Sequence, residues 1–471
     1  MIKYLNKNNL VIHLLFSLLF LSFIFAKGLV HIPLILITIF VFLTNKNFEF
    51  FKKKEIIFFL IFYFYLLLTT LVFNDIHEFN QVKTILFFFR FIFFTWALHI
   101  TLNQDTYKTS FNVLVFLLFL ILIDSILQFL THKNFLGYDI IQLTRVSSFF
   151  KDELILGSFV SKILPIIFIS YLKVTNKVNN KFLILIIISS YILVFLSGER
   201  VAFFNLNFFY LLILVFIMKK KKFKVPATLF FIFFFVMMSF FILKALSFIQ
   251  KNYFTNYLCD NTEYLDMKSL NLVCDNKEIN SPRLSLNTIK EQSGFNFTIC
   301  LDRYSDLPLD RAKKLCSLRA EKPLIILFGY KIHYLFSVQH HSHFEAAWNM
   351  FKNRPIIGNG IKSFRYICED YKINRYSCSS HPHNHIAQML SESGIIGLIF
   401  FGIFYLYFIY KLIIIFLLKK IDNKKFIECI ALSAIIINFF PFLPSGFLFT
   451  NWSGTLNFLP LFYYFSLTKK K

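Results

Sequence analysis

Several common sequence signals are missing from this chain of 471 residues. It carries neither a Walker motif nor a dinucleotide-binding fingerprint, so nothing supports a nucleotide-driven mechanism. It has no Cys-x-x-Cys pair, which argues against a zinc site built on the cysteines without excluding one. There is no internal repeat and no Pro-rich or Ser-rich linker. No small-residue cleavage site follows the first apolar run, Val11 to Ala26, so we expect a retained helix and not a signal peptide.

Apolar and aromatic residues dominate the composition. The sequence is 57% hydrophobic and 20% aromatic, with 68 phenylalanines, and its mean hydropathy is +0.62. These values predict an integral membrane protein. The formal net charge of +24 does not indicate nucleic-acid binding, because the lysines lie in short clusters between apolar runs and form no single basic face.

Apolar runs long enough to cross, or nearly cross, a hydrocarbon core of roughly 30 Å give twelve candidate spans. They lie near residues 11–26, 29–44, 55–73, 84–102, 111–131, 154–172, 182–198, 201–218, 226–249, 390–418, 426–446 and 455–468. Backbone groups in lipid have to pair within their own segment, so these runs predict helices. The expected fold class is all-α: a polytopic membrane protein of about twelve transmembrane helices with one large periplasmic loop domain.

The lysine clusters predict the orientation of the spans. With a cytoplasmic N-terminus, the clusters near residues 3–7, 46–54, 108, 173–181, 219–224, 419–425 and 469–471 all fall on the cytoplasmic side. We therefore expect a multi-pass membrane protein with both termini cytoplasmic. The expected domains are 1–249 with nine transmembrane helices, 250–388 as a periplasmic loop domain carrying part of the active site, and 389–471 with three transmembrane helices.

Arginine follows a different pattern from lysine. No arginine falls in an expected cytoplasmic loop: all ten lie in outer segments except Arg90, which interrupts the fourth span. Lysine suffices where only a positive charge is needed, whereas the planar fork of arginine suits phosphate or carboxylate. Arg145 and Arg200 lie in two outer connections that could converge on one anionic group. For Arg90, snorkelling to the interface and inward binding of an anion remain alternatives.

The outer segment also holds six of the seven cysteines, while Cys429 lies in a span. An even set on the outer side fits an oxidising periplasm and as many as three disulfides, whose pairing the sequence does not give. The six are Cys259, Cys274, Cys300, Cys316, Cys368 and Cys378.

Three histidines in five residues, His381, His383 and His385, stand at the mouth of the tenth span. Histidine is the side chain best matched to proton transfer near neutral pH. Two alternatives stay open: a zinc site shared with the segment His340-His341-x-His343, and histidines bonded only to the backbone. The turn Gly358-Asn359-Gly360 is either structural or part of an anion site.

The ordered outer elements resemble the O-antigen ligase and O-antigen polymerase superfamily of bacterial envelope enzymes. The resembling pieces are the Arg145 loop, Ser-Gly-Glu-Arg200, the helix Ala-Ala-Trp-Asn-Met-Phe leading into Arg-Pro-Ile-Ile-Gly-Asn-Gly and Phe364, and His383-Asn384 followed by Gln388, Leu390, Glu392, Gly394 and Gly397. The resemblance implies a metal-independent membrane glycosyltransferase without cofactor. The resemblance further implies a bacterial inner-membrane enzyme that takes a glycan from undecaprenyl diphosphate and passes it to lipid A–core (ligase) or to another lipid-linked repeat unit (polymerase).

Such a transfer needs a base near the acceptor hydroxyl and cations on the departing diphosphate. We expect His383, Arg145 and Arg200 to be catalytic, and Arg90, Asn384, Arg303 and Arg365 to bind substrate. Many relatives carry an arginine where this chain has His340-His341, so Arg303 or Arg365 is expected to substitute. A lipid-linked oligosaccharide flippase or other transporter is the alternative from another class. It is disfavoured because the polar residues gather at one face and not at the midplane.

Overall fold

The computed structural model describes residues 2–45, 47–72, 78–140, 145–175, 180–220, 325–327, 330–332, 338–373, 377–418 and 420–468. The first part of the chain forms α1 (Ile2–Phe25), η1 (Lys27–Leu29), α2 (His31–Thr44), η2 (Glu49–Lys52), α3 (Lys54–Val72), α4 (Glu78–Phe88), α5 (Arg90–Thr101), α6 (Gln104–Thr131), η3 (Ser148–Phe150), α7 (Leu156–Thr175), α8 (Asn180–Ser197) and α9 (Arg200–Lys220). The second part forms β1 (Ile325–Leu327), β2 (Tyr330–Ile332), α13 (Val338–Asn353), α14 (Ser363–Ile367), η6 (Cys368–Tyr371), α15 (His385–Leu417), α16 (Asn423–Asn438) and α17 (Trp452–Leu467).

The apolar runs of the sequence are helices. Seven helical segments of the described residues are long and apolar enough to cross a membrane, those around α2, α3, α4–α5, α6, α7, α9 and α15. The expected run 226–249 lies outside the described residues, and the count of twelve stays a prediction. The fourth run is broken at Phe89, between α4 and α5. The expectation of an all-α chain needs a small correction, because β1 and β2 pair as an antiparallel hairpin with Ile325 opposite Ile332.

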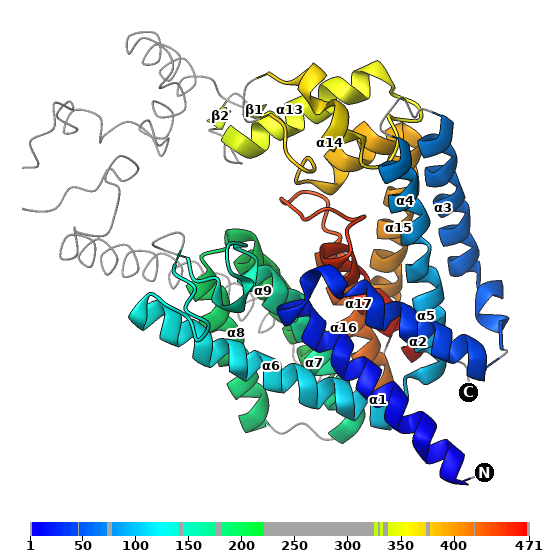
Figure 1. The fold of residues 1–471 in the computed structure, drawn as a ribbon, viewed down its shortest axis with the longest axis vertical. Coiled ribbons are helices and arrows are strands. Elements are labelled where there is room, and N and C mark those ends of the chain that lie inside the picture. The colour runs from blue at the N-terminus through cyan, green and yellow to red at the C-terminus, as the bar shows by residue number, and fades with distance from the viewer. Residues whose placement is uncertain are drawn as a thin grey trace, which may run out of the picture.

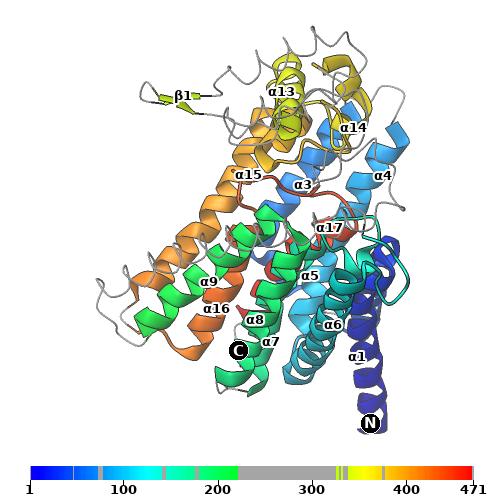
Figure 2. The same cartoon turned by 90° about the vertical axis from the view of Figure 1, so that its left-hand side faces the viewer.

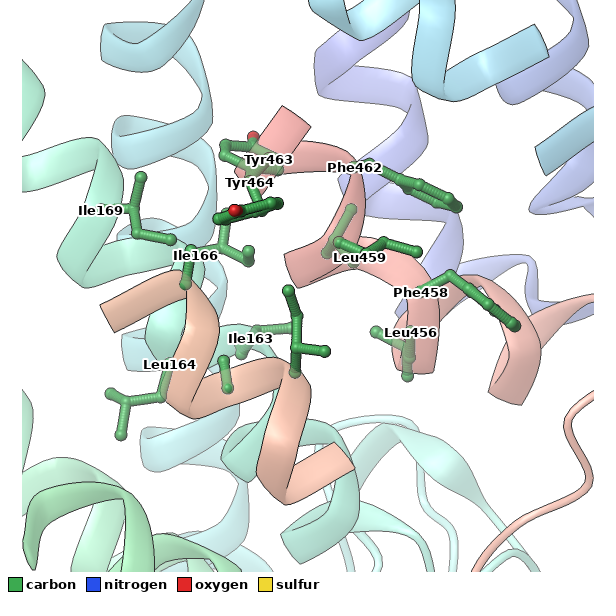
Figure 3. Packing of buried hydrophobic residues seen from close by; sticks show 14 of the residues in the cluster. Ile163, Leu164, Ile166, Ile169, Leu456, Phe458, Leu459, Phe462, Tyr463 and Tyr464 are labelled. Carbon is green, nitrogen blue, oxygen red and sulfur yellow. The ribbon is translucent and has the colours of Figure 1, made fainter. Parts of the chain in front are cut away.

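Helix α7 forms the centre of the membrane part. It packs against α6, α8, α9, α16 and α17, and 78% of its span is buried inside the protein. Figure 3 shows Ile163 and Ile166 of α7 in the same apolar cluster as Leu459 and Tyr464 of α17. Most of its residues are apolar, and its polar residues Ser161, Lys162 and Ser170 are buried as well.

A small second layer of α13, α14 and η6 lies across one end of the helices (Figures 1 and 2). Its own core consists of Ala346, Ala347, Met350, Phe364 and Cys368. The layer rests on the first turns of α15, because both α13 and α14 contact that helix. We call this end of the molecule the layer end.

A disulfide fixes the edge of this layer. Cys368 and Cys378 are bonded, with a sequence separation of 10 residues. The pair agrees with an oxidising outer compartment. Cys259, Cys274, Cys300 and Cys316 lie outside the described residues, and Cys429 is a buried free thiol in α16.

The layer is locked to α15 at a break in that helix. Gly394 has φ 65° and ψ −167°, which interrupts the helical hydrogen bonds. The freed amides of Ile395 and Ile396 donate instead to the carbonyls of Pro355 and Ile356, at 2.8 and 3.3 Å. The carbonyl of Ser393 accepts the hydroxyl of Tyr65 at 2.6 Å. The break thus provides the docking point for the loop that follows α13.

Candidate functional site

The site is built around the segment that leads into α15. Asn384 is the N-cap of this helix: its side-chain oxygen accepts the amide of Ala387 at 3.0 Å. Its amide nitrogen donates to the carbonyls of Pro441 and Leu443, at 2.9 and 3.3 Å. Both ends of the Asn384 side chain are therefore engaged in joining the start of α15 to the loop between α16 and α17.

His383 precedes this cap in a strained conformation. Its φ is 54°, in the left-handed region that residues other than glycine seldom adopt. The carbonyl of His383 accepts the amide of Ser445 at 2.8 Å, which helps hold this conformation. Its ring, in contrast, makes no hydrogen bond to the residues that the structure describes. Strained backbone of this kind is often found at functional sites.

Four imidazoles converge at this point. The ring of His383 lies 3.9 Å from that of His381, 5.2 Å from that of His343 and 5.4 Å from that of His340, between ring centroids. His340 and His343 come from α13, so the layer end brings together residues that are far apart in sequence. We call these four residues the histidine cluster. His385 is not a member: it is fully buried and contacts Asn438 and Ser445.

Two members of the cluster, His343 and His381, are held by backbone carbonyls. His343 Nδ1 lies 2.9 Å from the carbonyl of Ser377, and His381 Nε2 lies 3.3 Å from the carbonyl of Ser445. The second nitrogen of His343 is buried without a hydrogen-bond partner among the described residues. The cluster therefore retains a ring nitrogen, Nε2 of His343, that can make a further hydrogen bond.

Burial and mutual repulsion keep the cluster uncharged. Burial lowers the pKa of each of the four rings below the ordinary 6.5, and for His340 and His383 neighbouring histidines lower it further. The pKa of His381 falls to about 4 and that of His383 to about 2. All four rings are consequently neutral near pH 7, the form in which an imidazole accepts a hydrogen bond or a proton, and so low a pKa makes His383 a weak base in the absence of substrate.

The donor geometry does not favour metal binding. Among the described residues, no group of three or more His, Cys, Asp or Glu side chains is arranged to hold a metal ion. The zinc alternative for the histidine cluster therefore gains no support from the arrangement of its rings. Proton transfer and hydrogen bonding are the chemistry that this arrangement offers.

A second polar group lies where the Arg145 loop meets the turn between α8 and α9. Arg145 donates from Nε to the carbonyl of Ser197 at 3.0 Å and from Nη2 to the carbonyl of Leu154 at 3.2 Å. The two outer loops thus contact each other, and the convergence of Arg145 and Arg200 on one anionic group stays a prediction. Arg200, the first residue of α9, is exposed. Neither arginine makes a hydrogen bond or ion pair to His383 within the described residues.

Glu199 is the centre of this second group. Its carboxylate accepts the amides of Gly157 and Ser158 at 2.7 and 3.2 Å, and so caps the start of α7. Burial raises the pKa of Glu199, while the Ser158 hydroxyl and the charge of Arg145 oppose this. A side chain added at Gly157 would meet the Ser197 hydroxyl at 2.4 Å, so only glycine allows this close approach.

The remaining expected residues lie in different surroundings. Arg90 stands at the break between α4 and α5, where Nη1 donates to the Phe87 carbonyl at 2.6 Å and Nη2 to Asn451 Oδ1 at 2.8 Å. Arg365 is exposed on α14, and its charge acts on His381. Arg303 lies outside the described residues.

The turn at Gly358 serves packing. A side chain at Gly358 would meet backbone atoms of Glu392, Ser393 and Gly394 at 2.5 Å. Asn359 donates from its side chain to the carbonyl of Ser391 at 2.8 Å. Of the two alternatives for this turn, these contacts support the structural one.

Two residues of this region had no assigned role at the sequence level. Glu199 belongs to the Ser-Gly-Glu-Arg motif, and Lys162 lies inside the apolar run 154–172. A charge within an apolar run is the sequence signal that identifies Lys162 as unusual, because charged residues in spans are rare and usually face the protein interior.

Fold and site together define a multi-pass membrane protein with a polar, histidine-rich site at one end of its helices. Residues 341–402, from α13 through the break in α15, match the family model described as O-antigen ligase. The match supports the resemblance of this chain to the O-antigen ligase and polymerase superfamily. The family indicates a membrane glycosyltransferase-like enzyme with lipid-linked glycan substrates. A comparison with curated proteins gives no match.

Proposed function

We propose that the protein transfers a glycan from undecaprenyl diphosphate to lipid A–core or a similar acceptor. The observation that carries this proposal is the convergence of His340, His343 and His381 on the ring of His383, within the segment that matches the ligase family. The histidine cluster lies at the layer end. The lysine distribution supports a periplasmic position for that end and a cytoplasmic position for both termini.

In this mechanism His383 is the base. Its neutral ring accepts the proton of the acceptor hydroxyl as the hydroxyl oxygen attacks the anomeric carbon of the lipid-linked glycan. The bond between that carbon and the diphosphate oxygen breaks, and the diphosphate leaves with the electron pair. His383 then releases its proton to water. The left-handed backbone, held by Ser445, fixes the ring for this step.

Arg145 and Arg200 are proposed to stabilise the departing diphosphate. Arg145 uses Nε and Nη2 for backbone carbonyls, which leaves Nη1 for a phosphate oxygen. Arg200 is exposed at the start of α9 and makes no hydrogen bond to the described residues. Fixed cations at the edge of a low-dielectric site favour the charge that builds up on the leaving group.

Arg90, Asn384, Arg303 and Arg365 complete the proposed substrate-binding set. The contacts of Asn384 and Arg90 to backbone and side-chain oxygens indicate that these two act by shaping the site. Arg365 is exposed on α14, and its charge acts on His381. It therefore suits a sugar or phosphate group next to the histidine cluster.

The test is a deletion strain complemented with wild type, His383→Ala or His341→Gln. His341 is the matched control, since it lies on α13 but pairs with Glu345 at 3.7 Å and is not in the histidine cluster. We expect His383→Ala to insert and fold but to lose transfer, and His341→Gln to retain it. A folded His383→Ala protein with full transfer would refute the proposed role.

The glycan ladder of the deletion strain separates ligase from polymerase. Loss of all long chains from lipid A–core, with accumulation of the lipid-linked polymer, indicates a ligase. A single repeat unit on the core indicates a polymerase, the alternative that uses the same donor. An unchanged ladder contradicts both functions.

A further inference from the structure

Asp124 is a carboxylate inside the long apolar helix α6. It lies seven residues before Thr131, the last residue of the helix, and hence about 10 Å along the helix axis from that end. Its side chain is fully buried. A carboxylate within a membrane span is costly, and it is usually retained because it has a defined partner and a function. The groups that Asp124 contacts therefore indicate what it does.

Asp124 joins the two arms of the loop that carries Arg145. Its Oδ1 atom accepts the amide of Phe135 at 2.8 Å, in the arm that leaves α6. Its Oδ2 atom accepts the hydroxyl of Ser148, in the arm that follows Arg145. One carboxylate thus fixes both arms to the same point of α6, which an apolar side chain at this position could not do.

Gln128 lies one turn further along α6 and repeats this pattern. Its side-chain oxygen accepts the amides of Ser147 and Ser148 at 3.2 and 2.6 Å, and its nitrogen donates to the carbonyl of Tyr138 at 3.2 Å. From the loop itself, Asn134 donates from its side chain to the carbonyl of Ser148 at 3.1 Å. Residues four positions apart lie on the same face of a helix, so this amide and the carboxylate one turn earlier act as one anchor.

The anchored arm is irregular backbone that is buried among helices. Ser147 and Ser148 are both buried, and Ser148 has a φ of 53°, in the left-handed region. Non-helical backbone inside a membrane protein occurs only where protein groups or a water-filled cavity satisfy its amides and carbonyls. Here the side chains on α6 supply the acceptors. This requirement explains why an otherwise apolar span carries an aspartate and a glutamine.

The anchored arm leads directly to Arg145, three residues before Ser148. The amide of Val146 donates to the carbonyl of Leu196 at 2.9 Å, and Nε of Arg145 donates to the carbonyl of Ser197 at 3.0 Å. The arm therefore connects α6 on one side with the turn between α8 and α9 on the other. The position of the guanidinium depends on both attachments, and Asp124 belongs to the one on α6.

We propose that Asp124 is a positioning residue for the transfer reaction, which through Ser148 holds the guanidinium of Arg145 in place for the departing diphosphate. This inference rests on the proposed function and deepens it. Asp124 acts through the loop and does not touch the substrate. A shift of a catalytic group by about 1 Å can cost on the order of 10²-fold in rate. The effect falls on kcat, because a cation at the leaving group acts mainly in the transition state.

The kinetic test compares Asp124→Ala, Asp124→Asn and Ser125→Ala, with purified protein and lipid-linked donor. Ser125 is the matched control, since it is equally buried in α6 and its hydroxyl has no hydrogen-bond partner among the described residues. We expect Asp124→Ala to lower kcat by roughly tenfold or more and to change KM by less than about threefold. Asp124→Asn should retain most of the activity, because its oxygen can accept the Phe135 amide and its nitrogen can donate to the Ser148 hydroxyl.

Ser125→Ala is expected to equal wild type. A kcat of Asp124→Ala within about threefold of wild type overturns the proposal, because a misplaced arginine should cost more than that. A loss in Ser125→Ala as large as that in Asp124→Ala also overturns it, since the effect would then belong to the packing of α6 and not to the loop.

A double-mutant cycle with Arg145→Gln separates positioning from a general loss of stability. Arg145→Gln should keep a measurable turnover, because removal of one such donor costs on the order of 10²-fold. If Asp124 acts through Arg145, adding Asp124→Ala to Arg145→Gln lowers kcat by no more than about twofold. A further drop as large as that in the wild-type background shows that Asp124 does not act through Arg145, and rejects the proposal.

Ser148→Ala covers the case in which Asp124→Ala does not fold. It removes only the hydroxyl that Asp124 accepts and leaves the Phe135 contact in place. A lowered kcat that disappears in the Arg145→Gln background supports the proposal, whereas a wild-type kcat contradicts it. If His383→Ala is inactive but Asp124→Ala is fully active, the inference fails alone. If His383→Ala and Arg145→Gln are both fully active, the proposed function fails with it.

Discussion

Substitution of Gly394 by alanine is expected to detach the layer end from α15. The backbone of Gly394, at φ 65° and ψ −167°, lies in a region open essentially to glycine, and forcing another residue into it costs about 1–3 kcal/mol. The new Cβ atom would stand 2.4 Å from the carbonyl oxygen of Ile356, so the loop after α13 has to move. That movement strains the hydrogen bonds from Ile395 and Ile396, each worth about 1 kcal/mol.

The total loss is about 3–5 kcal/mol, which for a chain of 471 residues should lower the Tm of the detergent-solubilised protein by roughly 3–5 °C. Gly402→Ala is the control on the same helix. A Cβ atom there meets nothing within 4 Å, and alanine in a helix interior is favoured over glycine by about 0.5–1 kcal/mol. Thermal unfolding of both variants, followed by tryptophan fluorescence, measures the difference. Equal Tm values for the two would refute the docking role of the break.

Two further predictions concern the layer end. Reduction of the Cys368–Cys378 disulfide, which closes a loop of about 10 residues, should cost about 2.5 kcal/mol; dithiothreitol should therefore lower the Tm of wild type by more than it lowers that of a Cys368→Ala/Cys378→Ala protein. Acid should destabilise the fold, because His381 with its lowered pKa stays neutral in the folded state while the unfolded chain takes up a proton below pH 6.5. Its share of the loss reaches roughly 3 kcal/mol as the pH falls from 6.5 to 4, and the Tm of His381→Gln should depend less on pH across that range than the Tm of wild type.

The helices were the part of the fold that the sequence predicted best. A hydrocarbon layer demands long apolar segments whose backbone is satisfied internally, so local composition is enough to locate them. The breaks were harder to predict. At Phe89 the dihedral angles stay helical, but the amides of Phe89 and Ile92 make three-residue hydrogen bonds, and Arg90 donates beside this point to Phe87 and Asn451. Asn451 lies in the loop before α17, so the sequence of residues 84–102 alone does not predict this contact.

The histidine cluster was predictable in part. His381 and His383 attract attention because they stand together, and His340 and His343 were visible only as a rival metal-binding segment. That His340 and His343 meet His383 depends on how α13 lies on α15, which is a tertiary property. The disulfide partner of Cys368 was likewise open among six outer cysteines until the chain path was known.

The arginines use the planar donor geometry that the sequence argument relied on, but the partners in the structure differ from the expected ones. Arginine was expected where its planar fork matters, with phosphate as the partner. Arg145 and Arg90 do use the fork, but each directs it mainly at oxygen atoms of the protein, and so joins segments that are far apart in the chain. A lysine could not replace either, since a single ammonium does not span two such acceptors. In the proposed mechanism, binding of the diphosphate then depends on the exposed Arg200 and on the remaining donor of Arg145.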